Sequence, residues 1–180
     1  MIKYITRERL ESWGPCDDYT AERIDELAAG RSRIAVTTVF DLPIPLEYRV
    51  WMLCHEGILS NEAFRCLSRK FAMHVIDLWD VTNIVRRFLE TGYKSIRDAA
   101  MDSARTVALN EVGASKFAAM SAMYACRSIS LSAMDASSVD AWDATWDASK
   151  TARKAMAANN LELSEAFWQL EQIRKEIERC

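Results

Sequence analysis

The chain has 180 residues, of which half are hydrophobic and 27% are charged. This length suits a single domain with a sizeable core, and the composition excludes an intrinsically disordered chain. The formal net charge of -3 disfavours a general nucleic-acid binder, which needs a positive excess to displace the counterions of phosphates.

The cysteines and the hydropathy of the sequence favour a cytoplasmic location. The cysteines are odd in number and form no CxxC pair, which is typical of reduced thiols in a cytosolic protein. They are Cys16, Cys54, Cys66, Cys126 and Cys180. The first residues carry charge from the third position, so we expect no secretory signal. No apolar run is long enough to span a bilayer, and we therefore expect a cytoplasmic protein without membrane contacts.

The first quarter of the chain holds all three prolines and is predicted to be irregular. Thr6 is a good cap for a short helix over residues 7–13, and Thr20 for a second helix over 21–29. Residues 33–40 are β-branched like a strand. Because we find no partner strand elsewhere in the sequence, we expect an irregular segment or a short helix there.

From Pro45 onward the pattern is helical. Pro45 suits the first position of a helix over residues 46–55, and Ser60 suits the cap of a helix over 61–79. Apolar residues at steps of three and four form one stripe on the latter. The stripe consists of Phe64, Leu67, Phe71, Val75 and Leu78. Two further helices are predicted, one from Asp80 or Thr82 to residue 90 and one over 94–109.

Gly113 is the last glycine of the chain, and residues 114–180 contain neither glycine nor proline. Small side chains dominate residues 114–152, so helix backbones can approach closely. A larger apolar edge, expected to face the core, begins with Phe117, Met120 and Met123 or Tyr124 and continues through Ile129 or Leu131 to Met134. Serines near 137 and the pair Asn159-Asn160 are expected to interrupt the helices.

The final helix, over residues 161–178, carries its own apolar stripe, which we expect to face the core. The stripe consists of Leu163, Ala166, Phe167, Leu170, Ile173 and Ile177. Together these patterns predict a single all-α domain: an irregular helical part over residues 1–42 and a compact antiparallel helical bundle over 43–180.

One segment, DAWDATWDAS, has two interpretations, of which the structural one is favoured. Trp142 and Trp146 are one helical turn apart on one face, and Asp140, Asp143 and Asp147 form a neighbouring acidic stripe. The structural interpretation is that the indoles fill space above small residues of a neighbouring helix. The functional alternative is a partner-binding face, since tryptophan is enriched at interface hot spots.

The same segment resembles a family of Ala- and Trp-rich proposed immunity proteins of bacteria and phages. The stretch LPIPLEYRVWML at 42–53 is similar to an "IPxExRLWxLL"-like helix of that family, and 61–75 to the helix that follows it. The opening at 6–16 is also similar, but Pro15 departs from the family pattern. The resemblance implies no catalytic residues. It implies a protein that binds and neutralises another protein.

Sites of chemistry are weighed against structural roles. Cys54-His55 is read as a core cysteine beside a helix-end histidine, and His74 as a hydrogen-bonded structural histidine. Neither histidine follows a glutamate by three residues, as a di-metal bundle requires, so no metal is expected. Phosphate-binding glycine loops are absent from the sequence, and no cofactor is expected.

A basic cluster leaves a second functional class open. It consists of Arg65, Arg69, Lys70, Arg86 and Arg87 in the region 65–97, where acidic residues are interspersed. An ordinary solvated face is favoured, and an anion or nucleic-acid contact is the alternative. The main hypothesis is a non-enzymatic protein that binds a toxin, a defence protein or a host enzyme. The second is a nucleic-acid-associated accessory protein.

Overall fold

The computed structural model describes residues 1–15, 26, 28–128 and 140–179. Of these, 73% are helical, and the prediction of an all-α fold is confirmed. The predicted helix over 21–29 and the interruption near 137 fall largely or wholly outside the described residues.

The N-terminal part pairs two short strands. β1 (Tyr4–Thr6) and β2 (Arg33–Ala35) are antiparallel, with Ile5 opposite Ile34. The expectation that residues 33–40 lack a strand partner is therefore wrong, because the partner lies in the first six residues. The rest of that segment forms the short 3-10 helix η1 (Val36–Asp41), as the alternative predicted. Between the strands, α1 (Arg7–Ser12) begins where the Thr6 hydroxyl accepts the Arg9 N–H at 3.3 Å.

Helices α3 to α6 follow with short 3-10 turns between them. The α-helices are α3 (Leu46–Leu53), α4 (Asn61–His74), α5 (Asn83–Thr91) and α6 (Arg97–Asn110). The 3-10 helices η2 (Ile76–Leu78) and η3 (Lys94–Ile96) precede α5 and α6. As predicted, the Ser60 hydroxyl caps α4 by accepting the Ala63 N–H at 3.2 Å, and Gly92 ends α5 with φ of +67°. Pro45 is the residue before the first turn of α3 rather than its first member.

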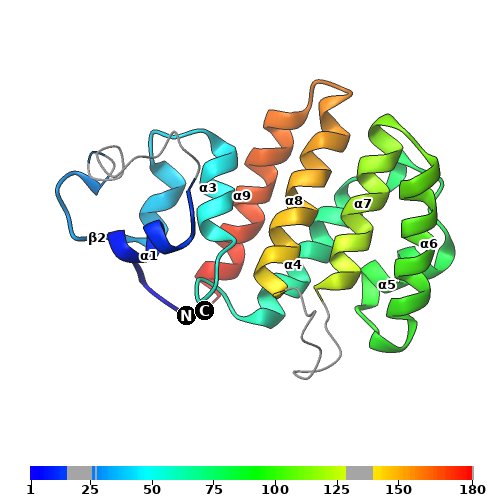
Figure 1. Cartoon of the computed structure of the whole chain (residues 1–180), viewed down its shortest axis with the longest axis horizontal. Coiled ribbons are helices and arrows are strands. Elements are labelled where there is room, and N and C mark those ends of the chain that lie inside the picture. The colour runs from blue at the N-terminus through cyan, green and yellow to red at the C-terminus, as the bar shows by residue number, and fades with distance from the viewer. Residues whose placement is uncertain (16–25, 27, 129–139, 180) are drawn as a thin grey trace.

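The last three helices are α7 (Gly113–Arg127), α8 (Ala141–Ala157) and α9 (Glu162–Glu178). Figure 1 shows α3, α9, α8, α7 and α6 side by side in one row, with α4 and α5 behind them. Helix α9, from the end of the chain, thus lies between α3 and α8. In the view of Figure 1, Met1 and the C-terminal end of α9 lie towards the same edge of the molecule.

The centre of the row is a seam of small side chains between α7 and α8. Its members are fully buried: Ala118, Ala122 and Ala125 on α7, and Ala144, Ala148 and Ala152 on α8. Ser121 donates a 2.8 Å hydrogen bond to the carbonyl of Ala148, and Thr145 donates one of the same length to the carbonyl of Phe64 on α4. Serine and threonine side chains are short, so they reach the backbone of a neighbouring helix only where the two helices approach closely. This close approach is what the small residues of 114–152 predicted.

The two predicted apolar edges differ in how far they face the core. On α7, Phe117, Met120 and Met123 are half-buried and pack against the hydrophobic core, as expected, while several smaller residues of the helix are buried completely. Tyr124, the alternative to Met123, is half-buried, and the expected continuation through Ile129 or Leu131 to Met134 lies outside the described residues. On α9, Leu163 and Phe167 are 70% and 59% exposed. Their places inside are taken by Glu165 and Gln169, which are completely buried. The prediction that Leu163 and Phe167 face the core is wrong.

Candidate functional site

A pocket of about 400 Å³ lies between the N-terminal part and helix α8. Leu10, Ile34, Leu42 and Ile44 contribute an aliphatic wall from the N-terminal part. Helix α3 supplies Glu47, Tyr48, Trp51 and Met52, whose spacing places them on one helical face. The volume falls within the range of roughly 300–1,000 Å³ that is usual for ligand sites.

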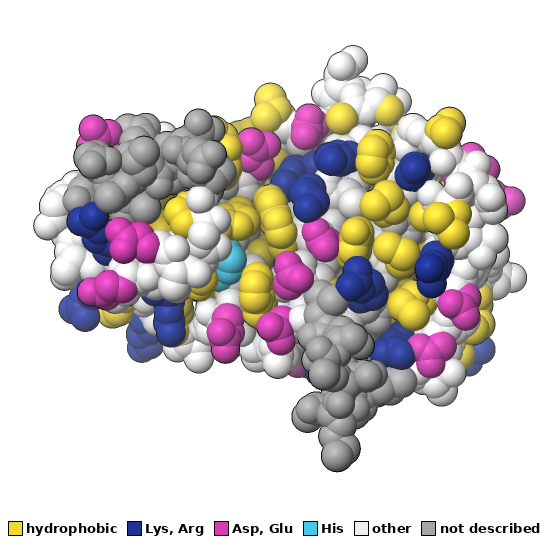
Figure 2. All heavy atoms as spheres, viewed as in Figure 1, with side chains coloured by type: hydrophobic (Ala, Val, Ile, Leu, Met, Phe, Trp, Pro, Cys, Tyr) yellow, Lys and Arg dark blue, Asp and Glu magenta, His cyan; other side chains and the backbone are white. Residues whose placement is uncertain are grey.

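The opposite wall is a charged face of α8. Trp146, Lys150, Arg153 and Lys154 recur at steps of three and four, so that they share that face. Glu162, at the start of α9, completes the rim. Figure 2 shows Lys and Arg side chains gathered at the C-terminal end of α8, next to hydrophobic side chains. The pocket is therefore apolar on one side and mainly cationic on the other.

Arg153 is the buried cation of this wall. Its side chain lies over the indole of Trp146, with the guanidinium carbon 5.0 Å from the ring centroid, and the residue is 4% exposed. Its Nη1 donates to the hydroxyl of Ser149 at 3.0 Å and to Oε1 of Gln169 at 3.2 Å. Burial lowers the pKa of Arg153, and the nearby carboxylates of Glu47 and Glu162 oppose that shift. Within the described part of the chain, no carboxylate oxygen lies within 4.0 Å of the guanidinium.

Behind Arg153, a buried polar network crosses from α8 through α9 to α4. The amide nitrogen of Gln169 donates to Oε1 of Glu165 at 2.9 Å and to the Ser149 carbonyl at 3.1 Å. The other carboxylate oxygen of Glu165 is 2.6 Å from Nδ1 of His74. His74 also stacks on Trp168 with a centroid distance of 3.7 Å. This arrangement agrees with the interpretation of His74 as a hydrogen-bonded structural histidine.

An aromatic cluster borders the pocket. His55 stacks on Trp13 at 4.3 Å and meets Trp51 edge-on at 4.6 Å, and the ring of Trp142 lies 5.0 Å away. Neither ring nitrogen of His55 has a hydrogen-bond partner among the described residues. Burial lowers the pKa of His55 to about 4, so the ring is neutral at neutral pH.

The neighbouring thiol is equally unreactive in its resting state. Cys54 is 1% exposed, and burial raises its pKa to about 12, although Arg153 acts in the opposite direction. A thiol with so high a pKa forms almost no thiolate at neutral pH. The interpretation of Cys54 as a core cysteine agrees with this geometry.

The Trp-Asp segment forms the beginning of α8 and continues into the pocket wall. Trp142 and Trp146 are half-buried and pack against the hydrophobic core; the ring of Trp142 lies beside His55, and that of Trp146 lies against the guanidinium of Arg153. Asp147 pairs with Lys150 at 3.0 Å. The pKa of Asp143 is raised, mainly by burial and secondly by the nearby carboxylate of Asp147. Asp140 is exposed and lies just before the first turn of the helix. The structure thus brings Trp142, Trp146, Asp143 and Asp147 together on one accessible face.

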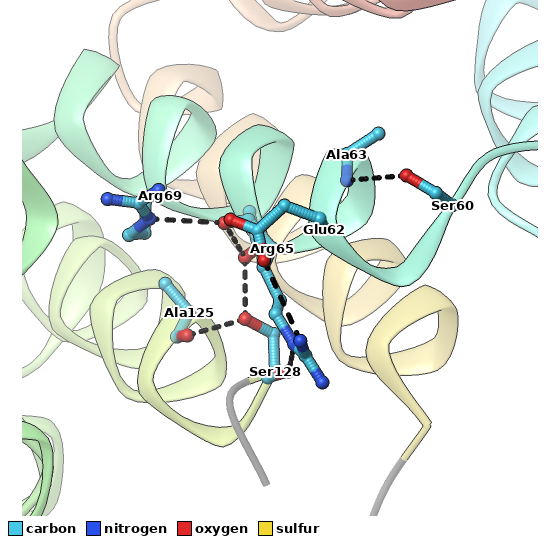
Figure 3. A network of polar contacts seen from close by, with 8 residues as sticks. Ser60, Glu62, Ala63, Arg65, Arg69, Ala125 and Ser128 are labelled. Atoms are coloured by element: carbon cyan, nitrogen blue, oxygen red, sulfur yellow. Dashed lines mark hydrogen bonds and ion pairs between the residues drawn. The ribbon is translucent and has the colours of Figure 1, made fainter. Parts of the chain in front are cut away.

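The basic cluster is largely engaged within the molecule. Figure 3 shows the side chain of Arg65 reaching the end of α7, where its Nε donates to the Ser128 carbonyl at 3.1 Å. Arg69 donates to the carbonyl of Arg65 at 3.3 Å. Lys70 pairs with Glu176 at 2.7 Å, and Arg86 with Asp77 at 3.3 Å, whereas Arg87 is exposed. These residues do not form a common open surface patch of free cations.

Sequence reasoning missed the site's central residue. Arg153 and its partners Ser149 and Gln169 carry no motif, and the pocket is assembled from segments more than 100 residues apart. The only available signal was the spacing of Trp146, Lys150 and Arg153 along one helical face.

Comparison of the chain with protein-family models, with curated proteins and with solved structures found no match. None of the described helices is long and apolar enough to cross a membrane. The described residues also contain no group of three or more His, Cys, Asp or Glu placed to hold a metal ion.

Proposed function

We propose that this chain is a non-enzymatic binding protein that neutralises another protein, as an immunity protein or a phage-encoded inhibitor does. The pocket between α3 and α8 receives an apolar anchor of the partner, and the Trp142–Asp147 face extends the contact. The observation that carries the proposal is the pocket itself, with its apolar wall, its half-buried tryptophans and its buried arginine.

The composition of this surface supports protein binding. Interface hot spots are enriched in Trp, Tyr and Arg and lie around pockets that exclude water. Tyr48, Trp51, Trp146 and Arg153 all line this pocket. Its rim carries both signs of charge, with Glu47 and Glu162 opposite Lys150 and Lys154. Such rims give an interface specificity and orientation more than affinity.

Binding accounts for the site better than catalysis does. The Cys54 thiol is protonated and buried, and the neutral ring of His55 is enclosed by three tryptophans. His74 is engaged with Glu165. A nucleophile needs a base within hydrogen-bond reach, and the contacts of these groups support a packing role instead. The proposed setting is the cytoplasm, where the buried thiols of Cys54 and Cys126 stay reduced.

Site-specific photocrosslinking in the native host tests the proposal. Benzoylphenylalanine replaces Tyr48 on the pocket wall in one variant and Tyr93, which is 56% exposed near α5, in the control. We expect one discrete protein adduct from position 48 and none from position 93. Adducts of equal yield at both positions, or none at position 48 with the protein expressed and folded, would refute the assignment of the interface.

A further inference from the structure

We propose that the ligand of the pocket is a hydrophobic group that carries one carboxylate, held by the free edge of the Arg153 guanidinium. This inference deepens the proposed function, on which it rests for the partner, because it names the chemistry of the anchor that the pocket takes.

The donors of Arg153 identify the class of ligand. A guanidinium has five N–H donors, and Ser149 and Gln169 together use two of them, both on Nη1. Three donors remain (five minus two), on Nε and Nη2, and no described residue accepts them. These two nitrogens form the edge that binds a carboxylate through two parallel hydrogen bonds.

That edge also reaches open space. In the described structure, the completely buried side-chain nitrogens without a hydrogen-bond partner belong to His55, Trp79 and Arg174. Nε and Nη2 of Arg153 also lack such a partner there but are not in this set, so these two atoms are accessible. Arg153 is nevertheless only 4% exposed and lines the pocket. The space that Nε and Nη2 reach is therefore the pocket.

The guanidinium is held in place before any ligand arrives. Oε1 of Gln169 accepts from both Ser149, at 2.9 Å, and Arg153, while the amide nitrogen of Gln169 is used by Glu165 and a carbonyl. Trp146 covers one face of the guanidinium. Glu165 is connected to Arg153 through the side chain of Gln169 and acts on the guanidinium electrostatically without occupying its free edge. A preorganised cation loses little entropy when it binds its anion.

The other charges of the pocket favour a single carboxylate over a dianion. Lys150 is paired with Asp147, and Lys154 is exposed, with its Nζ 5.6 Å from the ring centroid of Phe117. Glu47 and Glu162 on the rim repel additional negative charge. The aliphatic wall of Leu42, Ile44 and Met52 accepts the apolar body of the ligand.

Titration of the purified protein with small acids, followed by calorimetry, tests the ligand class without any partner. Decanoate and 4-phenylbutyrate are the probes, and decanol and decyltrimethylammonium are the uncharged and cationic controls. We expect saturable binding of the acids and, for decanol, affinity lower by about 10- to 100-fold, as the loss of a charge-assisted hydrogen-bond pair implies. Decanol binding as tightly as decanoate, or no acid binding at millimolar concentration, would overturn the proposal.

Variants link the binding to the guanidinium. Arg153→Lys keeps the charge and loses the two-pronged edge, so we expect acid binding to weaken by about tenfold or more. Glu47→Gln removes an exposed carboxylate from the rim and should strengthen acid binding several-fold. Lys175→Gln, an exposed change on α9, is the matched control and should have no effect. If Arg153→Lys does not fold, an unchanged affinity in Glu47→Gln still contradicts the proposal.

The last arm separates the sources of the carboxylate. A peptide that ends in leucine is compared with its C-terminal amide. Binding of the acid peptide alone identifies the C-terminus of a partner chain, and binding of decanoate without either peptide identifies a free small acid; both support the carboxylate assignment. Crosslinking at position 48 without any acid binding would leave the proposed function standing and remove this inference. Acid binding without a crosslinked protein would remove the proposed function and leave the carboxylate assignment standing.

Discussion

His55 makes the stability of the fold depend on pH. Its ring is 4% exposed, packs against Trp13, Trp51 and Trp142, and has no hydrogen-bond partner in the described structure. Burial lowers its pKa from 6.5 to about 4. At a pH between these two pKa values, the histidine is protonated in the unfolded chain but stays neutral in the folded chain. The stabilisation is complete above pH 6.5 and is lost as the pH falls towards 4.

The size of the effect follows from the shift. A difference of about 2.5 pKa units is worth on the order of 3 kcal/mol, of which about 2 kcal/mol is lost between pH 7.5 and pH 5. Replacing His55 by phenylalanine keeps an aromatic ring in the cluster and removes both the titration and the two unpaired nitrogens. We therefore compare the free energy of unfolding of His55→Phe with that of the wild type at each pH. We expect the variant's advantage to be larger at pH 5 than at pH 7.5 by about 2 kcal/mol.

Urea unfolding monitored by circular dichroism at several pH values between 5 and 7.5 measures this difference. The comparison with His55→Phe cancels the titration of all other groups, because they are common to both proteins. His74→Gln is the control for the second histidine. Parallel pH profiles for the wild type and His55→Phe would show that the ring does not titrate in the way its surroundings imply.

Four further changes, one of them a control at an exposed site, test the packing of the bundle by urea unfolding. Arg65→Met removes the donor to the Ser128 carbonyl at the end of α7 and should lower the free energy of unfolding by about 1–2 kcal/mol; no change would mean that solvent replaces it fully. Ala148→Leu adds bulk to the buried seam and should cost about 1–3 kcal/mol or more, whereas Leu163→Ser at an exposed site should stay within about 0.5 kcal/mol. Equal effects of these two changes would contradict the orientation of the helices. Gly92→Ala places a Cβ 2.5 Å from Nη1 of Arg69 at a backbone φ of +67°, and should cost about 1 kcal/mol or more; a stable variant would show that this turn is not left-handed.

The helices of the fold were largely predictable because their ends are local. Thr6 and Ser60 each accept a backbone N–H three residues on, and Gly92 ends its helix with a positive φ. These are interactions within a few residues of one another. The pairing of β1 with β2 was not predictable from such signals, since Tyr4–Thr6 alone is too short to show a strand pattern.

The rotation of α9 was mispredicted for a physical reason. A hydrophobic stripe predicts the buried face only where the interior is apolar. Here Glu165 and Gln169 form a hydrogen-bonded network with Ser149, Arg153 and His74, so the helix turns these residues inward. The pocket escaped prediction for the same reason, because its cation is defined by partners on other helices. For the Trp-Asp segment the sequence left packing and partner binding open, and its function stays a prediction.

The alanine seam between α7 and α8 restricts how this protein can evolve. Alanine has no rotamer to adjust, so a larger side chain on one helix has no neighbour that yields space for it. Glycine, serine and cysteine are the replacements that fit at positions such as 118, 144 and 148. Descendants of this sequence are therefore expected to diversify around the pocket rim and the outer helices, while the middle of the molecule drifts only among the smallest residues.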